Sequence, residues 1–125
     1  MKKILLSEDD EKTIAHYSPA IEHNNIIYVS GQLPILKGQT GPLTDVIEDQ
    51  TQIVLEKMET ILKAANSDRN KVLRVTIYIP DVAYWGKVNA VYREFFGDHR
   101  PARTIVPVND LHHNCLIELE AIAYK

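Results

Sequence analysis

Apolar residues recur at helical spacing in two segments of this sequence, and each segment carries signals for its ends. In the first, Asp45 and Glu48 stand three residues apart, as in a capping box, and Asn66 can adopt the left-handed conformation that ends a helix. Asp81 and Gly97 bound the second segment. One face of each predicted helix is apolar: Ile47, Val54, Met58, Ile61 and Ala65 in the first, and Tyr84, Val88, Val91, Tyr92 and Phe95 in the second.

Other segments have the composition of β-strands, because they are rich in β-branched residues and are bounded by turn-forming residues. The predicted strands cover residues 20–22, 26–31, 72–79, 104–108 and 115–123, with a further short candidate at residues 4–6. The pattern predicts an α+β fold in the order β-β-α-β-α-β-β, with both helices on one face of a sheet. The length of 125 residues suits a single domain that spans residues 1–125.

Several predicted strands are apolar on both faces, although two helices can cover only one face of the sheet. Residues 26–29 show no polar alternation, and Leu116 and Ile122 share a face with glutamates. A strand that is apolar on both faces is normally buried on both. We therefore expect a homo-oligomer in which copies of the chain cover the second face and share sites.

Charge and composition narrow the classes of function. Seventeen acidic against fourteen basic residues give a net charge of −3, without the basic cluster that nucleic-acid binding favours. Cys115 is the single cysteine, which excludes an intrachain disulfide and favours a reducing compartment. No segment resembles a signal peptide or a membrane span. We expect a cytoplasmic protein that binds neither nucleic acid nor membranes.

Glu118 and Glu120 lie two residues apart in the last predicted strand and so share one face. A carboxylate that is partly desolvated has a raised pKa, which suits a general base. The alternative is that both glutamates face solvent on a half-exposed strand.

Arg103 opens the preceding predicted strand. If residues 104–108 and 115–123 form a hairpin, Arg103 lies near Glu120 to Ala123, where its guanidinium could bind a substrate carboxylate and the glutamate could position a water. The alternative is a cross-strand ion pair of structural value only.

Weaker candidates surround this pair. Trp85 and Asn89 lie four residues apart on one helix face and could line a pocket. Tyr17 precedes the first predicted hairpin, and Ser30 and Gly31 close it at a point where a ligand could approach the backbone. No histidine or cysteine cluster has metal-ligand spacing and no nucleotide-binding motif occurs, so we expect neither a metal nor a cofactor.

Six short motifs, taken together and in order, resemble the reactive intermediate deaminase family, the RidA or YjgF type of enamine/imine deaminase. The resemblance covers nearly the whole chain. The motifs are Tyr17-Ser18-Pro19-Ala20, Tyr28-Val29-Ser30-Gly31-Gln32-Leu33-Pro34, Gln50-Thr51, Asn89-Ala90-Val91-Tyr92-Arg93-Glu94-Phe95-Phe96, Pro101-Ala102-Arg103-Thr104 and Ile117-Glu118-Leu119-Glu120-Ala121-Ile122-Ala123.

The resemblance implies a chorismate-mutase-like two-layer sandwich, with a mixed β-sheet packed on two helices. It also implies a homotrimer with clefts between subunits and no cofactor. The implied reaction is hydrolysis of 2-aminoacrylate and related 2-imino acids, including 2-iminobutanoate and 2-iminopropanoate, to 2-oxo acids and ammonia. By position, Arg103 would hold the substrate carboxylate and Glu120 would activate the water. The cleft would be lined by Tyr17, Ser30, Gly31, Trp85, Asn89 and the backbone at Ile105.

Two departures from the family pattern bear on the range of substrates. Ile105 stands where relatives often have cysteine, and Ala15-His16-Tyr17 replaces a common Gly-Pro-Tyr. An alternative function is therefore a regulatory module that binds small carboxylates in the same cleft without turnover.

Overall fold

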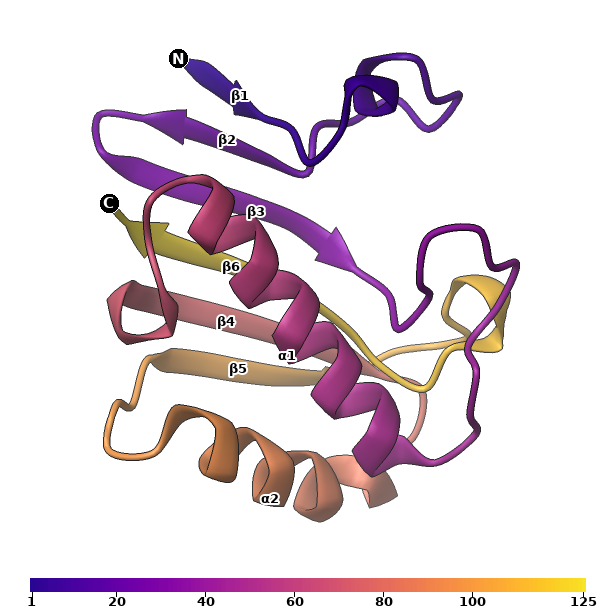
Figure 1. Cartoon of the computed structure of the whole chain (residues 1–125). Coiled ribbons are helices and arrows are strands. Elements are labelled where there is room, and N and C mark those ends of the chain that lie inside the picture. Colours follow the sequence, from indigo (N-terminus) through magenta and orange to yellow (C-terminus); the bar gives the residue numbers. More distant parts are fainter.

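Six strands form one sheet, and two helices lie on one side of it (Figure 1). The computed structural model describes residues 1–125. The strand order is β1-β2-β3-β6-β4-β5, and every neighbouring pair is antiparallel except β4 and β5. The elements are β1 (Lys2–Ile4), β2 (Ala20–His23), β3 (Ile26–Gln32), α1 (Ile47–Ala64), β4 (Val72–Ile79), α2 (Trp85–Phe96), β5 (Ala102–Pro107) and β6 (Glu118–Tyr124). The predicted α+β sandwich with a mixed sheet is confirmed.

The predicted pairing of the last two strands is wrong. β5 runs parallel to β4, and β4 lies between β5 and β6. The reason is that α2 returns the chain to the same end of the sheet, so the strand after it runs parallel to the strand before it. The leading strand also exists, at residues 2–4 instead of 4–6.

Asp81 caps the short 3-10 turn Val82–Tyr84 instead of α2, which begins at Trp85, and the predicted start of α1 is also not found. Asp45 does not cap this helix, because Val46 occupies the cap position without a side-chain bond and the Thr44 hydroxyl accepts a hydrogen bond from the Val46 amide (3.1 Å). The predicted ends are confirmed, since Asn66 and Gly97 have φ values of 59° and 61°.

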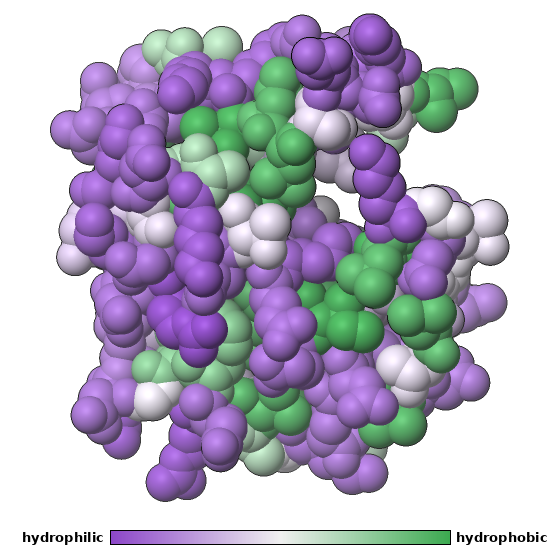
Figure 2. Space-filling model, viewed as in Figure 1, coloured by the Kyte–Doolittle hydropathy of each residue, from purple (hydrophilic) through white to green (hydrophobic).

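The apolar core lies between the sheet and the helices, and α1 crosses in front of the central strands (Figure 1). The outer surface on the helix side is largely hydrophilic (Figure 2). Neither helix is long and apolar enough to cross a bilayer. The largest fully buried apolar side chains are Ile27, Leu55, Met58, Ile61, Leu62, Ile77, Ile79, Ile117 and Leu119.

The opposite face of the sheet carries a mixture of apolar and polar side chains that no helix covers. Strand register places Tyr28 beside Ile122, Ile122 beside Arg74, and Glu120 beside Thr76. These five residues line a shallow hollow of about 230 Å³, and Tyr28 is 48% exposed. The expected homotrimer stays a prediction, and this face is the surface that it would cover.

Gln50 is a buried polar residue that ties two loops together. Its side-chain amide donates to the Thr44 carbonyl (2.7 Å) and accepts from the Leu116 amide (2.8 Å). Replacing Gln50 with leucine leaves both backbone groups without partners, so we expect the free energy of unfolding to fall by roughly 2–4 kcal/mol. Urea titration followed by circular dichroism measures this. The control is Gln52→Leu on the exposed side of α1, and equal effects of the two substitutions would contradict the prediction.

Candidate active site

Arg103 lies at the start of β5 and points toward α2. Its Nη1 donates to the Asn89 side-chain oxygen (2.9 Å), and its guanidinium carbon lies 4.6 Å from the centre of the Tyr92 ring and 5.4 Å from that of Trp85. Asn89, Tyr92 and Trp85 belong to the same helix face because they are spaced by three, four and seven residues. The predicted residues Trp85, Asn89 and Arg103 therefore come together.

Arg103 has no carboxylate partner, so the alternative of a structural ion pair is wrong. Ile105, two residues further along β5, packs against the core on the same side of the sheet. A cavity of about 540 Å³ opens beside Arg103. Its lining residues are Asn89, Tyr92, Arg93, Gly97, Arg100, Pro101 and Arg103.

A second group of predicted residues forms around β3. Tyr17, Gly31 and Glu118 line another cavity, of about 460 Å³. The Ser30 hydroxyl donates to the Ser18 carbonyl (2.6 Å), which holds the segment that carries Tyr17 against the strand. Gly31 lies where the register of β3 with β6 shifts, and a Cβ atom there would approach Glu118 Oε1 to 3.0 Å. Any larger residue at position 31 would crowd this carboxylate.

Glu118 has the electrostatic properties expected of a general base. Burial raises its pKa, the negative charge of Glu120 raises it further, and His112 lowers it. The family resemblance implies Glu120 as the carboxylate that activates the water, whereas in the structure Glu118 lies beside Gly31 and lines the cavity with Tyr17. The two glutamates share a face of β6, so they differ only in which residues of the neighbouring strands lie beside each of them.

Glu120 has a different environment. Its Oε1 accepts a hydrogen bond from the Tyr78 hydroxyl (2.7 Å), and it lines the hollow on the uncovered face. This hydrogen bond is the main reason why the pKa of Tyr78 is raised, since an ionised phenol could no longer donate it, and burial and the charge of Glu120 raise the pKa further.

Arg103 and the glutamates lie on opposite faces of the sheet within one chain. Arg103 is in register with Val75, and Val75 with Ala121, which is buried beneath the helices. Glu120, the neighbour of Ala121, points the other way. The two groups of candidate residues are therefore separate within one chain, and a site that contained both Arg103 and a glutamate would need a second copy.

Comparison with known proteins identifies the family. The family model described as endoribonuclease L-PSP matches residues 8–125. The chain belongs to the L-PSP family. This confirms the resemblance to RidA- and YjgF-type proteins.

The L-PSP relatives match along nearly the whole chain. A RutC family protein of Pyrococcus horikoshii is 44% identical and matches 100% of this chain and 99% of its own length. Reactive Intermediate Deaminase A, chloroplastic, of Arabidopsis thaliana is 35% identical, with 98% of this chain and 65% of that protein covered. Among solved structures, the YjgF gene product of E. coli has a TM-score of 0.87 at 29% identity, with 100% and 99% of the two chains covered.

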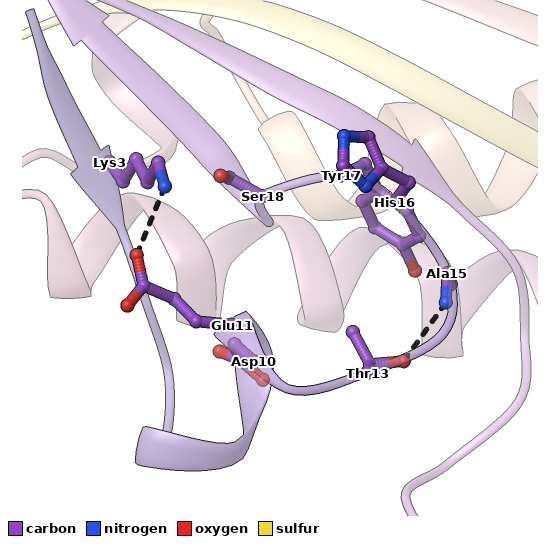
Figure 3. A pocket seen from close by; sticks show the side chains of 8 residues that line it. All are labelled: Lys3, Asp10, Glu11, Thr13, Ala15, His16, Tyr17 and Ser18. Carbon is purple, nitrogen blue, oxygen red and sulfur yellow. Dashed lines mark hydrogen bonds and ion pairs between the residues drawn. The ribbon is translucent and has the colours of Figure 1, made fainter.

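A third cavity, of about 510 Å³, lies beside the N-terminal segment of this L-PSP protein (Figure 3). Its charged groups are already engaged: Lys3 pairs with Glu11 (3.0 Å), and the Asp10 carboxylate accepts from the Leu6 and Ser7 amides, which lower its pKa. Tyr17, which also lines the cavity around Glu118, is the predicted site residue found there. These internal pairs leave the cavity with little chemistry of its own.

Proposed function

We propose that this L-PSP protein hydrolyses 2-imino acids and their enamine tautomers, including 2-aminoacrylate, to 2-oxo acids and ammonia. The observation that carries the proposal is the Arg103 guanidinium, held in place by Asn89 beside a cavity and left without an acidic partner. A relative with 35% identity named Reactive Intermediate Deaminase A supports the same reaction class.

Arg103 would bind the substrate carboxylate. A guanidinium donates two parallel hydrogen bonds to a carboxylate, and such charge-assisted pairs fix both position and orientation. The hydrogen bond to Asn89 and the rings of Tyr92 and Trp85 restrict the guanidinium before substrate arrives. Pre-organised binding of this kind lowers the entropy cost of reaching the reactive geometry.

Glu118 of a second copy would position the attacking water. The water oxygen forms a bond to the carbon of the protonated imine, the C=N electron pair moves onto nitrogen, and a water proton passes to the Glu118 carboxylate, which gives the carbinolamine. Glu118 then returns its proton to the nitrogen, the C–N bond breaks to release ammonia, and the hydroxyl proton passes to solvent as the carbonyl forms, so one water is consumed for each ammonia released. Tyr17 and the backbone at Ser30 and Gly31 would line this half of the site.

The two groups of candidate residues would meet across the subunit boundaries of a homotrimer. Support comes from the uncovered face of the sheet, which carries the glutamates together with Tyr28 and Ile122. Native mass spectrometry of the purified protein tests this arrangement, and a monomer that retains full activity would contradict it.

The test of the function is direct. An L-amino acid oxidase generates 2-iminobutanoate or 2-iminopropanoate in the assay, and semicarbazide traps the imine that survives. We expect added protein to lower semicarbazone formation in proportion to its concentration. An unchanged rate of trapping would contradict the proposal. If 2-oxobutyrate still raised the melting temperature in that case, the protein would be a binding module that uses the same cleft.

A further inference from the structure

The cavity beside Arg103 is lined by more positive charge than the proposed reaction uses. Arg93, in the last turn of α2, and Arg100, in the loop before β5, line it together with Arg103. None of the three forms an ion pair in this structure. Three guanidinium groups around one cavity repel each other, and a bound anion would relieve that repulsion.

Arg69, near the same end of α2, shows how this chain uses an arginine for structure. Its guanidinium donates to both carboxylate oxygens of Glu59 and to the Phe95 carbonyl, and it stacks on the Phe95 ring. Arg93 and Arg100 have no such partners and stay exposed. The contrast separates a structural arginine from two that are available to a ligand.

The Tyr92 hydroxyl is a second sign of a ligand in this cavity. Tyr92 lines the cavity and is only 6% exposed, yet its hydroxyl has no hydrogen-bond partner. Burial raises the pKa of Tyr92 to about 12, so the hydroxyl stays protonated and can donate a hydrogen bond to an anion. A buried hydroxyl without a partner is costly, and an acid oxygen would satisfy it.

We propose that this cavity binds a second acid group, so that the preferred substrates are dicarboxylic 2-imino acids and the preferred products are dicarboxylic 2-oxo acids. This inference rests on the proposed function, because Arg103 holds the first carboxylate. Arg93 and Arg100 hold the second. Both arginines line the same cavity as Arg103, so a short diacid that Arg103 binds at one end has its second acid group in the cavity that they line.

Two ligands that differ only at the far end test the inference. 2-Oxoglutarate and 2-oxopentanoate both have five carbons, and only the first has a second carboxylate. We expect titration calorimetry to show 2-oxoglutarate binding about tenfold more tightly at low salt, with the difference shrinking as salt screens the exposed arginines. Equal affinities would overturn the inference.

Charge variants assign the preference to these residues. The double substitution Arg93→Gln and Arg100→Gln should bring the affinity for 2-oxoglutarate down to that for 2-oxopentanoate. The matched control, Lys12→Gln with Lys87→Gln, removes the same charge from exposed positions outside the cavity and should keep the preference. A preference that survives the arginine substitutions would overturn the assignment.

Turnover separates failure of this inference from failure of the proposed function. Faster hydrolysis of 2-iminoglutarate than of 2-iminopentanoate is the expected result. Hydrolysis of both at equal kcat/KM would overturn the substrate preference and leave the deaminase standing. Hydrolysis of neither would overturn the deaminase, while the binding measurements would still decide whether the cavity takes diacids.

Discussion

Replacing Arg103 with alanine should lower kcat/KM for 2-imino acids about 100-fold or more. The substitution removes the group proposed to bind the substrate carboxylate, and loss of a desolvated charge-assisted pair costs about 3 kcal/mol, which corresponds to roughly 100-fold. Arg103 forms no ion pair within the chain, so its removal leaves no carboxylate of the protein without a partner. The loss should therefore appear in substrate binding and orientation, measured by the semicarbazide assay over a range of substrate concentrations.

The control for charge alone is Arg103→Lys. Lysine keeps the positive charge but cannot donate two parallel hydrogen bonds, so we expect about a tenfold loss in kcat/KM. Because Arg103 also lies over the Tyr92 ring, thermal melting of each variant is needed to show that the fold persists. Activity of Arg103→Ala within a factor of two of the unsubstituted protein would show that the carboxylate binds elsewhere.

The local elements could be predicted from the sequence because their signals are local. The strand at residues 72–79 has the predicted bounds, and Asn66 and Gly97 end their helices as expected. The pairing of β5 could not be predicted in this way. Residues 104–108 and 115–123 are neighbours in sequence, and proximity favours a hairpin, but the core beneath α2 places β5 beside β4 instead.

Part of the candidate site could likewise be predicted from local spacing, and part of it could not. Trp85 and Asn89 share a helix face by their spacing, so their association with Arg103 needed only one long-range contact. The proposal of Glu118 in place of Glu120 rests on the register of β3 against β6. That register shifts near Gly31, and no periodicity in the sequence reports it.

The positions of Arg103 and Glu118 connect the proposed reaction with the proposed oligomer. Arg103 lies beneath α2 and Glu118 lies on the face that no helix covers, so a reaction that uses both groups would require a second copy of the chain. If copies of the chain assemble through the uncovered face, the same subunit interface would bury the apolar side chains of that face and bring Glu118 close to the substrate. Both stability and catalysis would then depend on that interface.

Substitution of the two glutamates should give unequal results. Glu118→Gln keeps the size of the side chain and removes its capacity to accept a proton, so we expect kcat to fall by about 10²–10⁴-fold. Glu120→Gln should cost less than tenfold, because Glu120 bonds to Tyr78 and does not line the cavity with Tyr17 and Gly31. Steady-state kinetics with 2-iminobutanoate measure both effects.

The pH profile of Glu120→Gln carries the more specific test. A general base must be ionised, so activity falls as pH drops through the pKa of Glu118. The charge of Glu120 raises that pKa, and removing the charge should therefore move the acid limb of kcat/KM to lower pH. Tyr78→Phe keeps the Glu120 charge and serves as the control, for which we expect no shift to lower pH. If Glu120→Gln abolished turnover and Glu118→Gln did not, the catalytic role would belong to Glu120.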